Sequence, residues 1–335
     1  VELGNIELDL EKLDNVINEY VPAGRNIREQ KLMEFKKINE LYCLRELKDT
    51  KKFNRGIGTL GGGNHFIEID VDDENNKYLV IHTGSRNMGK QVADYYQNLA
   101  IQLCSGKEEM YKKKEKIIKN YKEQGKKLEI QQELNKLEKE YKNNKTNLPN
   151  DLCYLQGEHR EMYLHDMKIC QEYASLNRLQ IAKEILMNYF QLTYVPEIDY
   201  PPIMNNRFET IHNYISFEDN IVRKGAISAK KGEKVLIPIN MRDGSIIAAG
   251  KGNKDWNQSA PHGAGRIMSR MKAKKFELEK FKKAMEGIYT TSVVEETIDE
   301  APFVYKSMQE IIENIQDTVE IKKIIKPIYN FKAKN

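Results

Sequence analysis

The sequence has few cysteines, a single tryptophan and no long hydrophobic run. Its four cysteines, Cys43, Cys104, Cys153 and Cys170, have no paired short spacing. This spacing excludes a disulfide framework and a four-cysteine zinc site, and it favours free thiols in a reducing cytosol. No apolar stretch approaches the ~20 residues that cross a bilayer, and no secretory signal is visible. We therefore expect a cytoplasmic protein with no membrane partner.

The sequence also lacks a strong excess of either charge. Its net charge is only +4 over 335 residues, which is too small to prove a nucleic-acid partner but still permits one locally. With 40% hydrophobic and 31% charged residues, the composition is typical of a globular protein that buries a core. The chain begins with Val1, and its first residues resemble the middle of a domain, which predicts a preceding segment.

Apolar spacing predicts a mixture of helices and strands. Helical spacing covers most of 8–50, starts again near Met88, and covers 157–192 and 264–286. Alternating or continuous apolar runs predict strands at 65–71, 78–82, 234–240, 245–250 and 321–331. The pattern by itself indicates mixed α and β with antiparallel strands.

Residues 107–146 differ in character, with 13 Lys and 8 Glu. Apolar residues spaced by three and four predict two exposed helices that form an antiparallel hairpin within 105–148. Charge runs of this kind are usually solvated and carry no chemistry. The alternative is a Lys-rich surface that holds a phosphodiester backbone.

Residues 56–68 form the most informative stretch of the chain. Five glycines precede Asn64 and His65, and an alternating strand follows. Glycine permits unusual backbone paths and lets a ligand approach closely, so the Asn and His on this loop suit metal or phosphate binding. A tight turn followed by an ordinary strand histidine is the simpler alternative.

Four of the six histidines lie at strand ends or beside glycine: His65, His82, His212 and His262. Neutral imidazole is the commonest side-chain ligand of transition metals, so three of them could bind metal. His262 precedes Gly263-Ala264-Gly265-Arg266 and the predicted helix over 264–286, which would place it at a phosphate-binding helix N-terminus. There it suits a covalent phosphorylated or nucleotidylated histidine, with Arg266 neutralising phosphoryl charge.

These motifs, taken in order, resemble the RtcB family of RNA-splicing ligases. The resemblance runs from about residue 20 to the C-terminus. It rests on GTLGGGNHFIE (58–68), HTGSR (82–86), HN (212–213), RKGA (223–226), VLIP (235–238), GKGN (250–253) and HGAGRIMSR (262–270).

The resemblance implies a single large α+β domain over 1–335, with a central metal cleft and the charged hairpin projecting from it. It also implies a ligase that joins an RNA 3′-phosphate or 2′,3′-cyclic phosphate to a 5′-hydroxyl, using GTP and two Mn²⁺ ions. His262 would become guanylylated, and the GMP would pass to the RNA 3′-phosphate before the 5′-hydroxyl displaces it. An activating protein is a further possible partner, and tRNA splicing or RNA repair is the implied role.

The resemblance also implies site residues. His65, His82 and His212 match the metal-binding histidines, and Arg86 matches a position facing RNA or phosphate. The GMP-binding positions, besides His262 itself, match Asn64, Glu68, Asn240, Ser245, Gly263, Ala264, Gly265 and Lys332. Among these, Ser245 and Lys332 match residues that contact guanine.

The chain departs from the family in lacking the Asp-x-x-Cys-Gly motif, whose Asp and Cys bind manganese. A segment missing from the N-terminal side is the simplest explanation. Asn240 and Pro261 replace a more usual serine and cysteine, but neither change removes a reacting group. Two other functions stay open: a metal-dependent phosphoesterase, and a non-catalytic RNA-binding relative that lacks part of the metal site.

Overall fold

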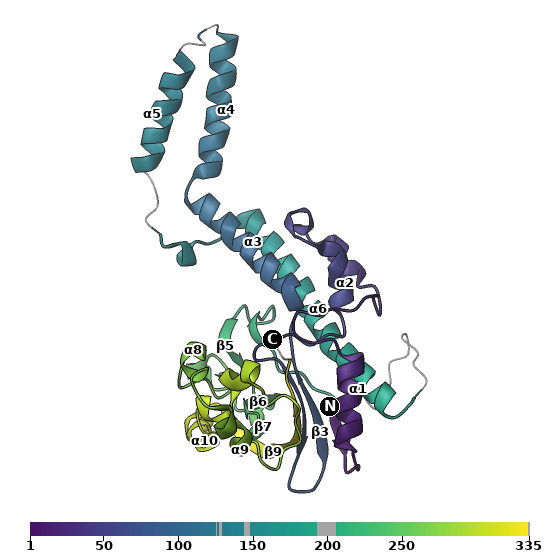
Figure 1. The fold of residues 1–335 in the computed structure, drawn as a ribbon. Helices are drawn as coiled ribbons and strands as arrows, with labels where there is room; N and C mark the ends of the chain where they lie inside the picture. Colours follow the sequence, from purple (N-terminus) through teal and green to yellow (C-terminus); the bar gives the residue numbers. More distant parts are fainter. Residues whose placement is uncertain (125, 127–128, 144–147, 193–205, 334–335) are drawn as a thin grey trace. The chain divides into compact units, whose positions relative to one another are not determined.

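The computed structural model describes residues 1–124, 126, 129–143, 148–192 and 206–333 (Figure 1). Contacts within the chain divide it into two compact units. The first unit comprises Val1–Phe35, Lys51–Arg86 and Gln171–Asn335, and the second comprises Lys36–Thr50 and Asn87–Cys170. All the predicted site residues lie in the first unit.

A six-stranded antiparallel sheet organises the first unit, in the order β1-β3-β2-β9-β7-β6. Its strands are β1 (Glu2–Gly4), β2 (Phe66–Val71), β3 (Lys77–His82), β6 (Lys234–Asn240), β7 (Gly244–Gly250) and β9 (Val319–Phe331). The long strand β9 pairs with β2 on one side and with β7 on the other. It therefore joins segments that lie far apart in the sequence.

The two faces of this sheet carry different cores, because successive side chains of a strand point to opposite faces. On one face, Ile67 and Ile69 pack with helix α1 (Leu10–Tyr20) and with the part of helix α6 (Gly157–Tyr189) that contains Ile181 and Ile185. Phe66 points to the other face and packs with Tyr78, Val80, Ile247 and Ile325. By the same alternation, Glu68 shares the face of Phe66.

A second sheet has the order β4-β5-β8. Its strands are β4 (His212–Ile215), β5 (Val222–Ser228) and β8 (Ser259–Pro261). Residues of β5 join a core with β6, β7 and helix α10 (Met308–Ile315). The remaining helical segments of this unit are α2 (Phe53–Gly56), η6 (Lys254–Trp256), α8 (Arg270–Ala273), α9 (Leu278–Ala284), η7 (Glu295–Glu300) and η8 (Pro302–Val304).

The second unit is helical. It contains η1 (Lys36–Glu40), η2 (Leu44–Glu46), most of α3 (Arg86–Cys104), α4 (Lys107–Glu123), α5 (Ile130–Asn143), η5 (Asn150–Leu152) and the first part of α6, while η3 (Thr50–Lys52) straddles its boundary. Helices α4 and α5 lie side by side (Figure 1). An ion pair between Lys114 and Glu138 joins them at 2.5 Å. Residues 125, 127–128 and 144–147 of the predicted hairpin lie outside the described residues.

The five strand predictions are confirmed to within a few residues, but two helix predictions are wrong. No helix spans 264–286, because residues 264–269 run without helical structure before the short helices α8 and α9. Gly265 has a φ of +71°, which is unfavourable in a helix. Likewise, residues 21–50 contain no α-helix and consist of 3₁₀ segments, turns, bends and irregular backbone. Among the described residues, no helix combines the length and hydropathy needed to cross a membrane.

Candidate active site

The four histidines singled out from the sequence form a row. The ring centroids of His65 and His82 are 6.0 Å apart, those of His82 and His212 are 5.3 Å apart, and those of His212 and His262 are 4.7 Å apart. The Nε2 atoms of His82 and His212 lie 3.3 Å from each other. Four residues spread over almost 200 positions therefore meet, because the first residues of β2 and β4 lie close to the last residues of β3 and β8.

Burial keeps three of these imidazoles neutral, because it penalises the charged form. Burial, followed by the charge of Arg86, lowers the pKa of His65 to about 4. Burial and then His262 lower the pKa of His212 to about 4. Burial and then His212 lower the pKa of His82 well below its ordinary value. Neutral rings keep the lone pairs that a metal ion requires.

The glycine loop holds His65 by close contact. A Cβ added to Gly61 would lie 1.9 Å from Nδ1 of His65 and 2.5 Å from Nη1 of Arg86, so only glycine leaves room for both side chains. Arg86 itself has a φ of +56°, and its guanidinium donates to the Gly24 carbonyl at 2.8 Å. Non-glycine residues in this region of φ are uncommon and cluster at functional sites.

Asn177 on α6 connects the two histidine-bearing loops. Its Oδ1 accepts from the backbone N–H groups of Gly58 and Thr59 at 2.8 and 3.1 Å. Its Nδ2 donates to the carbonyls of Thr59 and Gly84 at 3.2 and 3.0 Å. One fully buried side chain thus fixes the loop before His65 to the loop after His82.

A backbone carbonyl sets the tautomer of His262. Its Nδ1 lies 2.7 Å from the carbonyl oxygen of Gly225, which can only accept a hydrogen bond. Nδ1 therefore carries the proton, and Nε2 carries the free lone pair. Gly225, with a φ of +68°, is itself held by Asn213, whose Oδ1 accepts from the Gly225 N–H at 3.0 Å. His262 follows β8 rather than a helix N-terminus, so the helix-dipole argument for its chemistry is wrong.

Glu68 lies on the same face of the sheet as Phe66 and is buried. Its cross-strand neighbour Asn330 donates to Glu68 Oε1 at 2.5 Å. Burial raises the pKa of Glu68 to about 7, although the positive charge of Lys332 and the Asn330 bond oppose the shift. Burial therefore favours the protonated form of this carboxyl group.

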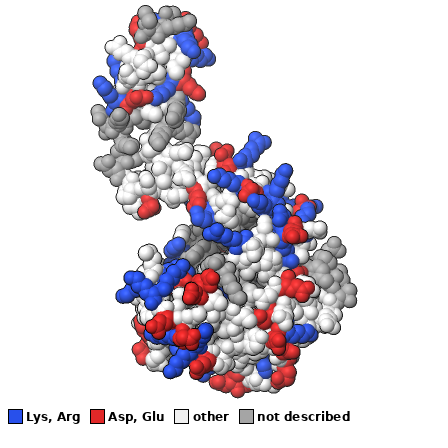
Figure 2. Space-filling view, viewed as in Figure 1, with Lys and Arg blue, Asp and Glu red and all other residues white. Residues whose placement is uncertain are grey.

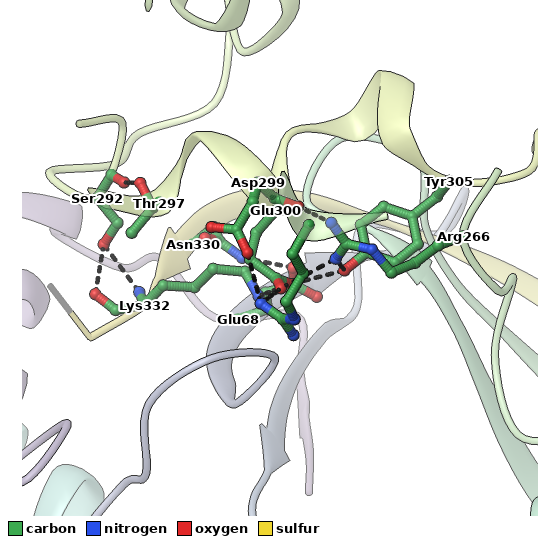
Figure 3. Close-up of polar contacts among 10 residues, drawn as sticks. Glu68, Arg266, Ser292, Thr297, Asp299, Glu300, Tyr305, Asn330 and Lys332 are labelled. Carbon is green, nitrogen blue, oxygen red and sulfur yellow. Dashed lines mark hydrogen bonds and ion pairs between the residues drawn. The ribbon is translucent and has the colours of Figure 1, made fainter. Parts of the chain in front are cut away.

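Lys332 and Arg266 meet at one buried carboxylate (Figure 3). Glu300 pairs with Lys332 at 3.2 Å, with Arg266 at 3.2 Å and with Arg270 at 2.7 Å, and Tyr305 donates to it at 2.6 Å. Burial opposes the ionisation of Glu300, but these cations and the tyrosine outweigh it and lower its pKa. Arg266, predicted to neutralise phosphoryl charge, therefore already has a carboxylate partner.

The other predicted nucleotide-binding residues vary in exposure. Ser245 is fully buried on β7, whereas Asn64 is exposed at the end of the glycine loop. Asn240 closes the turn between β6 and β7, where its Oδ1 accepts from the N–H groups of Arg242 and Asp243 at 3.0 and 2.9 Å. Residues 263–265 form the non-helical segment after His262, and the Ala264 N–H donates to the Pro238 carbonyl at 3.2 Å.

Several buried polar atoms of this region have no hydrogen-bond partner within the described part of the chain. They include Nδ1 of His65, Nδ1 of His212, Oγ of Ser245 and Oδ1 of Asn330. Unsatisfied buried polar atoms are rare in proteins and need an explanation, such as an absent ion or ligand. The two imidazole nitrogens are of the kind that binds a transition metal. However, no group of three or more His, Cys, Asp or Glu residues in the described ranges has the geometry of a metal site.

Fold and site together define an α+β protein whose buried polar site is built around four histidines. The family model described as tRNA-splicing ligase RtcB matches residues 4–333. The chain belongs to the RtcB family.

Three relatives illustrate the match. An RNA-splicing ligase RtcB from Escherichia coli K12 is 31% identical over 280 residues, covering 79% of this chain and 58% of the relative. A tRNA-splicing ligase RtcB from Nanoarchaeum equitans is 26% identical over 325 residues, covering 80% and 57%. One from Pyrococcus horikoshii is 25% identical over 304 residues, covering 78% and 31%. The chain thus spans little more than half of the first two relatives, and less of the third.

Sequence reasoning missed several residues that organise this site. Gly225 and Arg270 occur within motifs that carried the resemblance, so their positions were visible but their contacts were not. Asn177, Glu300 and Asn330 had no local signal, because each acts through a partner more than 30 positions away in the sequence.

Proposed function

We propose that this chain carries the catalytic site of a GTP- and Mn²⁺-dependent RNA ligase. The ligase would join RNA 3′-phosphate or 2′,3′-cyclic phosphate ends to 5′-hydroxyl ends through a histidine–GMP intermediate. Membership in the RtcB family supports ligase chemistry on RNA. The observation that carries the proposal is the tautomer of His262, whose Nε2 lone pair is free because Nδ1 donates to Gly225.

In this proposal, Nε2 of His262 attacks the α-phosphorus of GTP. The N–P bond forms as the bond from the α-phosphorus to the pyrophosphate oxygen breaks. The ring becomes positively charged, and the Gly225 carbonyl stabilises the Nδ1 proton through the transfer. The GMP then passes to the RNA 3′-phosphate, and the 5′-hydroxyl displaces it.

His65, His82 and His212 would hold the metal, since their rings are adjacent and neutral. Divalent ions bound there would neutralise the triphosphate and orient the leaving pyrophosphate. Glu68, Ser245 and Lys332 would contact guanine. The unsatisfied Oγ of Ser245 and the ionisable carboxyl of Glu68 can accept hydrogen bonds from its N–H groups.

Labelling with GTP tests the proposal directly. The full-length protein is incubated with Mn²⁺ and GTP labelled at the α-phosphate, and acid-labile label on the protein is measured. The wild type and a His159→Ala control should both carry label, whereas His262→Ala should carry none. Equal labelling of all three proteins, or label on none of them, contradicts the assignment of His262. A hydrolase would release GMP without forming the adduct.

A further inference from the structure

The net positive charge of the segment from Arg266 to Lys283 is larger than the net charge of the whole chain. It contains eight basic residues and two acidic ones, a net of +6, whereas the 335-residue chain has a net charge of +4. The basic residues are Arg266, Arg270, Lys272, Lys274, Lys275, Lys280, Lys282 and Lys283. Figure 2 shows blue side chains gathered over α8, the helix at the centre of this segment.

Three of these lysines are free to bind a partner. Lys272, Lys274 and Lys275 are exposed, and no ion pair holds any of them within the described part of the chain. In contrast, Arg266 and Arg270 bind the carboxylate of Glu300, and Lys282 pairs with Glu279. We refer to Lys272, Lys274 and Lys275 as the lysine triplet.

Apolar side chains stand exposed beside the lysine triplet. Met271 is 82% exposed and Ile267 is 58% exposed, and they are spaced four residues apart. Beside unpaired lysines, they offer a packing surface for the sugars and bases of a strand whose phosphates the lysines bind.

The helical segment that carries the triplet begins with a residue whose side chain reaches the candidate active site. The guanidinium of Arg270, the first residue of α8, lies 3.8 Å from the position that a Cβ on Gly63 would occupy. Gly63 belongs to the loop that ends at His65, so the guanidinium of Arg270 lies beside the loop that carries His65. The segment therefore offers positive charge to a strand whose end reacts at His262.

We propose that the lysine triplet binds the RNA strand where it leaves the active site. The inference rests on the proposed function, because it takes RNA as the occupant of the adjoining site. Each lysine contacts a backbone phosphate and releases condensed counterions, which gives affinity without sequence preference. Met271 and Ile267 pack against the sugar and base faces between these phosphates.

The test compares the wild type with the triple variant K272Q/K274Q/K275Q in the full-length protein. The control is K12Q/K322Q/K326Q, which removes three exposed lysines from α1 and β9 and changes the net charge equally. Binding of a long single-stranded 3′-phosphate RNA is measured by fluorescence anisotropy over a salt series. The triplet variant should bind roughly ten- to hundredfold more weakly at 0.1 M salt, and its log K against log[salt] slope should be shallower by about 2, since each contact contributes ~0.7.

Other readouts separate the possible outcomes. Formation of the histidine–GMP adduct and joining of short oligonucleotides should not change in the triplet variant, which also shows that it is folded. Wild-type RNA affinity in the triplet variant, or an equal loss in the control, overturns the inference. Triplet-dependent binding to phosphatidylserine vesicles without RNA binding also overturns it and identifies a membrane partner. If the wild type forms no adduct, the proposed function fails. The RNA-binding comparison would still test whether the lysine triplet binds RNA.

Discussion

A single methyl group added at Gly61 should displace His65 and slow guanylylation. The backbone of Gly61 does not have a positive φ, so Ala is acceptable to the main chain and the effect is steric. The new Cβ would lie 1.9 Å from Nδ1 and 2.5 Å from Cε1 of His65. Carbon contacts prefer ~3.5 Å or more, so the ring has to move by about 1.6 Å.

The size of this shift determines the expected result. Overpacking of this kind costs about 1–3 kcal/mol of stability, which leaves most domains folded. A misplacement of about 1 Å in a catalytic site can cost about 100-fold in rate. We therefore expect Gly61→Ala to remain folded but to form the GMP adduct at least about 100-fold more slowly.

A matched glycine provides the control. Gly84 follows His82, and a Cβ added there would meet nothing within 4 Å. Single-turnover labelling with GTP and Mn²⁺, together with thermal unfolding, should show that Gly84→Ala behaves like the wild type. Guanylylation of Gly61→Ala at the wild-type rate would refute the placement of His65. An equal loss in both variants would show that the effect is not specific to the His65 contact.

Three further predictions concern the groups that support the site. Burial raises the pKa of Glu68 from 4.5 to about 7. Between these two pH values the native state therefore binds more protons than the unfolded state. As the pH rises through this window, ionisation of the buried carboxyl group lowers the stability of the protein. The stability of Glu68→Gln relative to the wild type, measured by urea unfolding, should therefore increase between pH 5 and 7 and then level off, and a constant difference over this range would contradict the prediction. Glu300→Gln removes the carboxylate that pairs with Lys332, Arg266 and Arg270, so this variant should lose about 3–5 kcal/mol of unfolding free energy. Glu296→Gln, which changes an exposed residue of the same segment, should lose little stability. Asn177→Leu leaves the buried N–H groups of Gly58 and Thr59 without a partner and should lose about 2–4 kcal/mol, with slower guanylylation. Asn188→Leu on the same helix, which removes one bond to a carbonyl, should lose less; equal losses would contradict the role of Asn177.

The sequence predicted the strands well because their signal is local. Alternating or continuous apolar residues placed β2, β3, β6, β7 and β9 to within a few residues. The helix over 264–286 failed for a physical reason. Its apolar spacing is helical, but Gly265 adopts a positive φ, and Ala264 and Gly265 make backbone hydrogen bonds to Pro238 and Lys306 instead of to a helix. Tertiary contacts therefore overrode the local pattern.

For the site as well, local sequence patterns predicted some features and tertiary contacts determined the others. The motifs identified the four histidines, and the structure confirms that their rings gather, while their roles stay predictions. Arg266 was predicted to face phosphate, but its binding to Glu300 could not be anticipated from a residue 34 positions away. The carbonyl of Gly225, which sets the tautomer of His262, has no side chain to signal its role.

The sequence by itself determined which residue types are available: histidines at strand ends, glycines where side chains must approach closely, and a cluster of lysines after the last of these histidines. Only the tertiary structure decided their protonation and partners. The reason is that burial and hydrogen bonding depend on groups brought together by the pairing of β9 with β2 and β7, from opposite ends of the chain.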